Sequence, residues 1–161
     1  MNRTAAGVLP AKIAEASLLE LLHSEIGKNF EPDVCERMGN EIGFRFVARL
    51  PSGPPPYSVP LDILKFFCKD VWLELYGKKV DRLQTNHKGT FMCTDNAFLP
   101  LAKLKRASAS DIERFLAIHK GMIRGGLINL GVTVTEMTIQ ILGSGADSHN
   151  PLGCCFTIKT S

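Results

Sequence analysis

Hydrophobic positions along this chain predict three helices ahead of any strand. Side chains four residues apart share one face of an α-helix, because the helix turns once every 3.6 residues. The first such stretch begins at Ile13 and ends at Gly27, and its apolar ridge consists of Leu18, Leu22 and Ile26. We therefore expect an amphipathic helix here, with its ridge packed against another surface.

The second predicted helix begins near Asp33 and carries two neighbouring rows of side chains. One row is large and apolar: Val34, Met38, Ile42 and Phe46. The other row is small: Cys35, Gly39, Gly43 and Val47. A glycine inside a helix costs about 1 kcal/mol relative to alanine. The small row therefore predicts that another element approaches this face closely, so that packing offsets the poor helix propensity.

A stiff connector and a central helix come next. The segment "PSGPPPYSVP", residues 51–60, contains too many prolines for a helix or a central strand. The following "LDILKFFCKDVWLELYG", residues 61–77, is apolar on most faces of a helix. Such a helix is buried at the centre of a domain.

The period then changes to two, which predicts strands. "VDRLQT" and "TFMCTD" flank the turn sequence "NHKG", so we expect a hairpin from Val80 to Asp95. Two further strands are predicted at Val132–Leu142 and Cys154–Thr160, joined by a flexible loop. The sequence "SDIE", from Ser110 to Glu113, matches a capping box and predicts the start of another helix.

That helix, which we expect to end near Asn129, again contains glycines. Gly121 and Gly125 lie four residues apart, as Gly39 and Gly43 do, and predict a second close-packed helix face. The alternative that these glycines only mark frayed helix ends stays open. Arg124 lies between them, where it either anchors a hydrogen-bond network or extends into solvent.

The order α-α-α-β-β-α-β-β predicts an α+β fold. Helices that do not alternate with strands disfavour a doubly wound parallel sheet. We expect four or so helices on one face of a small four-stranded antiparallel sheet. Residues 1–12 show no periodicity and are expected to be loose, ahead of a single domain at residues 13–161.

Composition narrows the function. The net charge of +3 arises from 19 basic and 16 acidic residues, too balanced to indicate nucleic acid binding. The five cysteines form no C-x-x-C pair, so we expect buried free thiols in a reducing compartment, without a metal site. The chain shows no apolar signal segment at its start and no apolar stretch of membrane-spanning length. These features predict a soluble intracellular protein.

Candidate chemistry is sparse. None of the four histidines lies in a metal-binding or catalytic motif, and neither a phosphate-binding loop nor a nucleophile elbow occurs. His119 lies on an apolar helix face and is expected to be a hydrogen-bonded core histidine. We therefore expect no catalytic residue, cofactor or metal, although a Cys/His pair that meets only in the folded chain stays open.

Three segments, in order, resemble one family. "LDILKFFCKDVW", "RLQTNHKGTF" followed by "DN", and "GMIRGGLINLG" are similar to small subunits of the transport protein particle complex, TRAPP. The resemblance is strongest to the sixth-subunit branch, known in yeast as the Trs thirty-three type. It extends over residues 18–160 and is densest over residues 61–131.

The resemblance implies a non-catalytic subunit of a tethering complex in the cytoplasm, peripheral on ER-exit and early Golgi membranes. The assembled complex is a guanine-nucleotide exchange factor for a Rab-type GTPase. Subunits of this branch pair with a Bet-three-type subunit through their first two helices and also meet other TRAPP subunits. Carried over, this places five residues near a dimer interface: Leu18, Leu22, Val34, Met38 and Ile42. From the residues alone, these ridges could equally face the chain's own core, and a homodimer of the isolated chain stays open.

The chain differs from the Bet-three branch at one point that bears on a second possible function. The Bet-three branch carries an acylated cysteine just before the third helix, whereas residues 51–60 contain no cysteine here. Acylation by that route is therefore not implied. The alternative function is a small-molecule or acyl-chain binding domain, since the fold superfamily includes ligand-sensing modules. A dry pocket between the third helix and the sheet would favour this alternative, and a filled core would favour the subunit.

Overall fold

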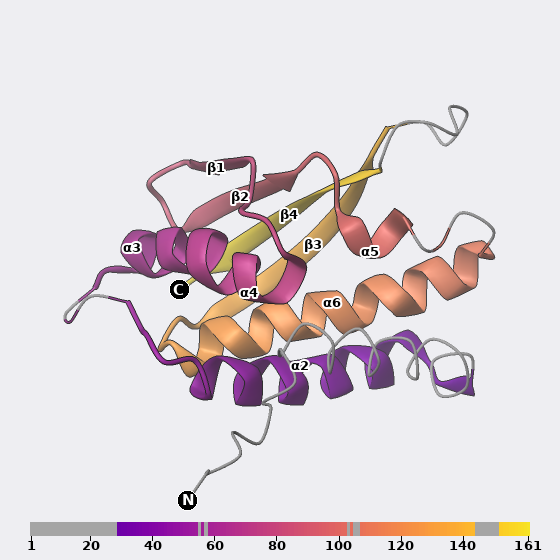
Figure 1. Cartoon of the computed structure of the whole chain (residues 1–161), viewed down its shortest axis with the longest axis horizontal. Coiled ribbons are helices and arrows are strands. Elements are labelled where there is room, and N and C mark those ends of the chain that lie inside the picture. Colours follow the sequence, from indigo (N-terminus) through magenta and orange to yellow (C-terminus); the bar gives the residue numbers. More distant parts are fainter. Residues whose placement is uncertain (1–28, 55, 57, 103, 105–106, 144–151) are drawn as a thin grey trace, which may run out of the picture.

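The computed structural model describes residues 29–54, 56, 58–102, 104, 107–143 and 152–161 (Figure 1). The predicted first helix, with Leu18 and Leu22, lies outside the described residues. The loose N-terminal segment and most of the loop between the last two strands also lie outside them.

Helix α2, Pro32–Ala48, is the predicted second helix. It begins with proline in its first turn, where the missing N–H would have no helical partner in any case. Its fully buried residues form the small row predicted from the sequence: Cys35, Gly39, Gly43 and Val47. The small row, and not the larger apolar ridge beside it, is therefore the innermost face of α2.

The predicted central helix is confirmed, with an irregular middle turn. It consists of α3 (Pro60–Phe66), a π-helical turn η3 (Phe67–Val71) and α4 (Trp72–Tyr76), which follow one another without a break. The carbonyl of Cys68, within the π turn, accepts a hydrogen bond from the Val80 N–H at 3.0 Å. This bond joins the helix to the chain that enters the hairpin. The helix ends at Tyr76, and its C-cap residue Gly77 adopts φ 75°, the left-handed conformation in which glycine commonly ends a helix.

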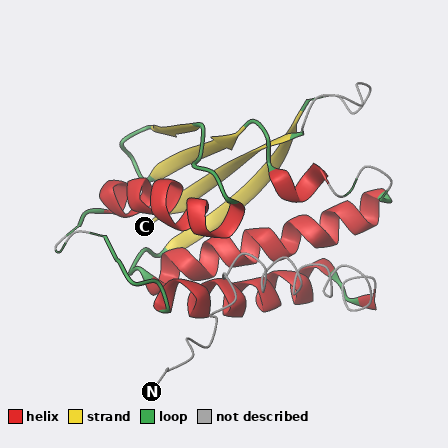
Figure 2. Ribbon diagram, viewed as in Figure 1, coloured by secondary structure: helices red, strands yellow, loops and turns green. Residues whose placement is uncertain are grey.

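Four antiparallel strands form one sheet in the order β1-β2-β4-β3 (Figure 2). The strands are β1 (Arg82–Thr85), β2 (Thr90–Asp95), β3 (Val134–Leu142) and β4 (Gly153–Thr160). The predicted hairpin is confirmed: His87 and Gly89 both take positive φ in its turn. The Asn86 side chain accepts from the backbone N–H groups of Lys88 and Thr90.

Two helices separate the hairpin from the last two strands. The short α5 (Leu99–Ala102) was not predicted, and α6 (Ala109–Asn129) is the predicted glycine-containing helix. The predicted cap at Ser110 is wrong by two residues. Ser108 is the N-cap, and its hydroxyl accepts a hydrogen bond from the Asp111 N–H at 3.2 Å. Ser108 and Asp111 have the same three-residue spacing as Ser110 and Glu113, but they lie two residues earlier in the chain.

Aromatic rings fill the space between the central helix and the sheet. The Trp72 ring lies 5.3 Å from that of Phe156 on β4 and 4.7 Å from that of Tyr76. Its indole N–H donates to the fully buried carboxylate of Asp95 at 2.9 Å. His119 is a core histidine, as predicted: it is fully buried, and its Nδ1 lies 3.0 Å from the Tyr76 hydroxyl.

These elements confirm the predicted α+β fold. The central helix and α6 pack against the sheet, and α2 packs along α6 as an outer layer (Figure 1). Along the described residues, the order differs from the predicted one only by the additional short α5.

Candidate interaction surface

The crossing of α2 and α6 brings together the four glycines singled out in the sequence. A side-chain Cβ on Gly39 would overlap the carbonyl oxygen of Ile118, and one on Gly43 would overlap that of Met122. The contacts pair Gly39 with Ile118 and, one turn further along both helices, Gly43 with Met122. The two helices therefore run parallel, as Figure 1 also shows. The side of α2 that meets α6 is therefore reduced to backbone.

The contact is reciprocal. A Cβ on Gly121 would overlap the Glu36 carbonyl oxygen, and one on Gly125 would overlap that of Asn40. Each helix thus offers a bare strip to the backbone of the other. Such close approach is available only to glycine, because any side chain would have to push a whole helix away.

Arg124 joins α2, α6 and β3. Its guanidinium lies 3.4 Å from Glu36 Oε1 and donates to the Val134 carbonyl at 3.3 Å. Glu36 also pairs with Lys120 at 2.8 Å. Helical periodicity places Lys120 on the solvent face of α6, but in the structure its side chain forms one end of a charge network. The Arg124 side chain remains 37% exposed, so the network lies at the surface rather than in the core.

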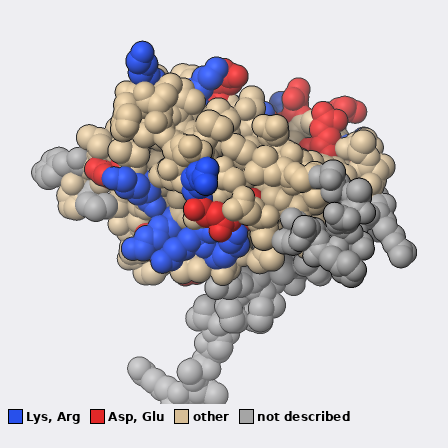
Figure 3. All heavy atoms as spheres, turned by 90° about the horizontal axis from the view of Figure 1, so that it is seen from above, with Lys and Arg blue, Asp and Glu red and all other residues tan. Residues whose placement is uncertain are grey.

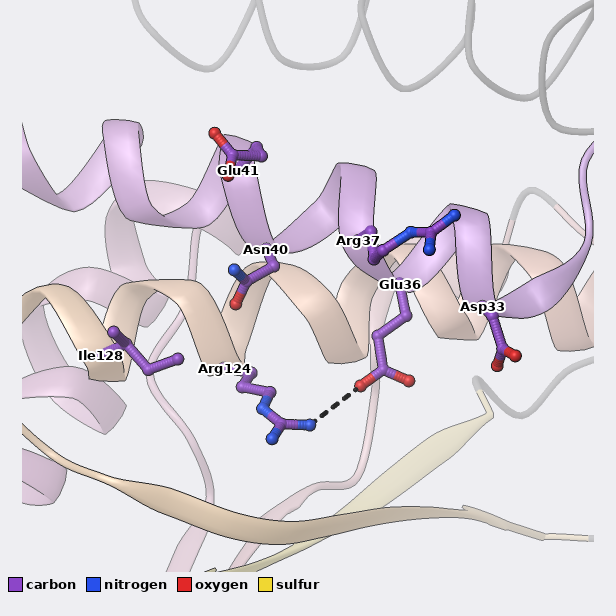
Figure 4. A pocket seen from close by; sticks show the side chains of 7 residues that line it. All are labelled: Asp33, Glu36, Arg37, Asn40, Glu41, Arg124 and Ile128. Carbon is purple, nitrogen blue, oxygen red and sulfur yellow. Dashed lines mark hydrogen bonds and ion pairs between the residues drawn. The ribbon is translucent and has the colours of Figure 1, made fainter.

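An open groove of about 830 Å³ runs beside this network (Figure 4). It is lined by residues of α2 and α6: Asp33, Glu36, Arg37, Asn40, Glu41, Arg124 and Ile128. Asn40 Oδ1 is buried in the groove wall and has no hydrogen-bond partner among the described residues. A buried acceptor without a donor favours binding of a group that donates.

Cys35 lies at the N-terminal end of the α2–α6 contact. Burial raises the pKa of its thiol, and the positive charge of Arg114 opposes this shift. The net direction is upward, so Cys35 is a neutral thiol at physiological pH.

The apolar ridge of α2 lies beside the glycine face. Val34, Met38 and Ile42 are all partly buried, and the last two pack against the core. The ridge therefore contacts the chain's own interior and still presents part of its surface. The part that contacts the core agrees with the core alternative, and the dimer interface stays a prediction.

Comparison with known proteins identifies the family. The family model for the transport protein particle (TRAPP) component matches residues 18–161. The chain belongs to the TRAPP family.

Relatives of this TRAPP chain include proteins named as subunits 6A and 6B of the trafficking protein particle complex. It is 34% identical to trafficking protein particle complex subunit 6A of Homo sapiens over 137 residues, 74% of this chain and 86% of that protein. It is also 34% identical to subunit 6b of Danio rerio, over 74% of this chain and 85% of that protein.

A solved structure has a similar fold at much lower sequence identity. Trafficking protein particle complex subunit 3 from Naegleria fowleri, covalently bound to palmitic acid, aligns with a TM-score of 0.59. The alignment covers 94% of this TRAPP chain and 95% of that chain, with 12% identity. At this identity the likeness shows the shared fold alone.

Two exposed apolar residues on this TRAPP chain were missed by the sequence analysis. Phe44 is 43% exposed and Ile128 is 41% exposed. Ile128 lines the groove with Arg124 on α6, and Phe44 lies on α2 one turn beyond Asn40, another residue of the groove lining. An available signal was that Phe44 interrupts the polar face of α2, next to Glu41 and Arg45.

The charge distribution and the other features of the described surface say little more about the function of this TRAPP chain. Seen from above, basic side chains gather beside a few acidic ones, and large areas carry no charge (Figure 3). A second open groove, of about 400 Å³, lies between the hairpin turn and the start of α3, with His87 and Lys88 in its lining. Within the described residues, no cluster of potential metal ligands occurs and no helix is long and apolar enough to span a membrane.

Proposed function

We propose that this chain is a structural, non-catalytic subunit of a TRAPP complex that acts in vesicle tethering and ER-to-Golgi traffic. The supporting observation is the match to relatives named as subunits of that complex, about 85% of whose length the chain covers. In this proposal the chain is cytoplasmic and reaches early Golgi and ER-exit membranes through the complex.

The proposed partner is a Bet-three-type small subunit, which meets the first two helices. The part-exposed ridge of Val34, Met38 and Ile42 supplies an apolar contact on α2, and Leu18 and Leu22 belong to the same proposed interface. Apolar interface cores with polar rims are typical of stable subunit contacts. Close packing of Gly39, Gly43, Gly121 and Gly125, with Arg124 beside them, would hold α2 in place for this contact.

The chain would support nucleotide exchange on a Rab-type GTPase only as part of the assembled complex. Other TRAPP subunits complete that assembly. The alternative function, acyl-chain binding, has no support in the described residues. Rings occupy the space between the central helix and the sheet, and the connector at residues 51–60 contains no cysteine that could carry an acyl group.

Co-purification with a Bet-three-type subunit tests the proposed pairing. Met38→Asp and Val34→Asp each put a charge into the apolar ridge, and we expect both to abolish pairing. Arg45→Asp is the matched control, because Arg45 lies on the same helix with its side chain 68% exposed. It should pair normally.

Circular dichroism and urea midpoints show whether each variant still folds. Val34→Asp provides a second test if Met38→Asp proves unstable, since Met38 packs against the core. If both aspartate variants fold and still co-purify with the partner, the interface lies elsewhere and this proposal is wrong.

A further inference from the structure

Two buried thiols meet between the central helix and the sheet. Cys68 lies in the π turn η3 and Cys93 lies in β2, and their Sγ atoms are 3.4 Å apart. At this distance one thiol donates a weak hydrogen bond to the other. Both side chains belong to the hydrophobic core, so the contact is enclosed by the fold itself.

The other three cysteines are placed differently. All five cysteines lie within the described part of the chain, and all are free thiols. Cys35 lies on α2, away from the sheet. Cys154 and Cys155 are neighbours in β4, so their side chains point to opposite faces of the sheet. Cys68 and Cys93 are therefore the two thiols that the fold brings together.

A disulfide between these two sulfurs requires little movement. The S–S bond is about 2.05 Å long, so the sulfurs must approach each other by about 1.4 Å. Cys93 is held at the centre of the sheet by its neighbours Leu83 of β1 and Phe156 of β4. Cys68 lies in a π turn, an irregularity that occurs often at functional sites of helices. We therefore expect Cys68 to supply most of the movement.

We propose that hydrogen peroxide converts this pair into a reversible disulfide. The peroxide first meets Cys68, which is 6% exposed, against 2% for Cys93. A sulfur–oxygen bond forms at Cys68 while the peroxide O–O bond breaks, which gives a sulfenic acid and one water. Cys93 then attacks the Cys68 sulfur: the S–S bond forms, the S–O bond breaks, and the leaving hydroxide takes the Cys93 proton as a second water. Each sulfur loses one electron, and the peroxide is reduced to two waters.

The surroundings of Cys93 suit the second of these steps. The hydrogen bond with Cys68, together with burial, raises the pKa of the Cys93 thiol well above its usual value. The thiolate is the form that attacks peroxide, so Cys93 stays inert until a sulfenic acid forms beside it. Two equivalents of a thiol such as glutathione reverse the cross-link by exchange.

The cross-link would join the helix layer to the sheet. It would tie η3 to β2 between residues that lie 25 positions apart in the chain, and the loop so closed contains α4, β1 and the hairpin turn. Closing a loop lowers the entropy of the unfolded chain, so the oxidised form should be the more stable one. The inference uses core residues alone and does not rest on the proposed function.

Peroxide treatment of the full chain, followed by mass spectrometry, tests the site. The chain is oxidised at neutral pH without denaturant, then unfolded, alkylated and digested. We expect a linked pair of peptides that contain Cys68 and Cys93, with the other three cysteines alkylated. Sulfoxide at Met92, which is 41% exposed, shows that the oxidant acted. The urea midpoint should rise on oxidation and return after treatment with glutathione.

Three alanine variants assign the roles. Cys93→Ala should stop the reaction at a sulfenic acid on Cys68, which dimedone traps, whereas Cys68→Ala should leave Cys93 unmodified. Cys35→Ala is the matched control at another buried cysteine and should still form the cross-link. Circular dichroism checks each fold, and if one variant of the pair is unfolded the other still tests the site. A wild type that is oxidised at Met92 but keeps all five cysteines alkylated overturns the proposal, as does a cross-link that persists in Cys68→Ala.

Discussion

Cys154, at the scale of one residue, links the stability of the sheet to pH. Its thiol is fully buried on β4, opposite Asp95 of β2. Burial, with smaller contributions from Asp95 and Cys155, raises the pKa of Cys154 from 9.0 to about 12. Between these two values the unfolded chain releases this proton while the folded chain keeps it. The free energy of unfolding must therefore fall as pH rises above about 9.

Replacing Cys154 isolates this effect. By pH 10 the titration of this thiol should lower the free energy of unfolding by about 1.4 kcal/mol relative to pH 7.5, and by about as much again for the next pH unit. Cys154→Ala removes the titrating group and adds a pH-independent packing loss. Urea midpoints of wild type and variant, measured near pH 7.5 and pH 10, should therefore converge at the higher pH. An unchanged difference between them would contradict the assigned cause.

The sequence predicted the structural roles of some individual residues better than those of others. The core role of His119 followed from its place on an apolar face. The Arg124 network was one of two alternatives, and the structure shows a contact on one side and solvent on the other. The cap was misplaced because Ser108 and Ser110 offer similar chemistry two residues apart. Only the backbone conformation, extended at Ser108, decides between them.

At the scale of elements, the glycine contact between α2 and α6 sets a steep limit on substitution. From the sequence alone, Gly125→Ala balances a gain of about 1 kcal/mol in helix propensity against an overpacking cost of about 1–3 kcal/mol. In the structure, the overpacking cost outweighs the gain in helix propensity. A Cβ on Gly125 would overlap backbone atoms of Asn40, which cannot move unless the helices separate.

We therefore expect Gly125→Ala to lower the free energy of unfolding, by up to about 2 kcal/mol. Gly39→Ala should do the same from the other helix. The double variant should lose less than the sum, because one separation of the helices makes room for both methyl groups. Urea unfolding measures all three, with the exposed Glu113→Ala of α6 as the control, expected to be within about 0.5 kcal/mol of wild type. Fully additive losses would argue against a shared helix contact.

The elements themselves were largely predictable, for a physical reason. Periodicity reports which residues share a face, so α2, the central helix, α6 and the strands could be placed from the sequence. The short α5 could not, because four residues carry no period. Periodicity also does not say which of two adjacent apolar rows lies deeper. On α2 the small row is the innermost one, which is why Val34, Met38 and Ile42 are only partly buried.

At the scale of the whole molecule, the pattern of hydrophobic residues does not show which helices and strands meet in space. The α2–α6 groove is lined by residues from helices far apart in the chain, and its shape depends on the register of the glycine contact. The position of β3 at one edge of the described sheet likewise depends on strand order, which alternation cannot reveal. Features that arise from long-range arrangement are therefore the ones that the structure adds to the candidate surfaces.

The last prediction concerns catalysis by the isolated chain. Nucleotide exchange requires a surface that reaches the phosphates and magnesium of the GTPase with an available charged or polar group. One small chain whose sequence shows no recognisable insert for this purpose is not expected to supply such a surface by itself. We therefore expect the purified chain not to accelerate release of a fluorescent nucleotide from a Rab-type GTPase. Stopped-flow fluorescence should compare the chain alone, the chain with a Bet-three-type subunit, and the assembled complex. Acceleration should require the assembly and should weaken when Met38→Asp blocks incorporation of the chain. Clear acceleration by the chain alone would show that it carries an exchange surface of its own, and the proposal of a non-catalytic subunit would be wrong.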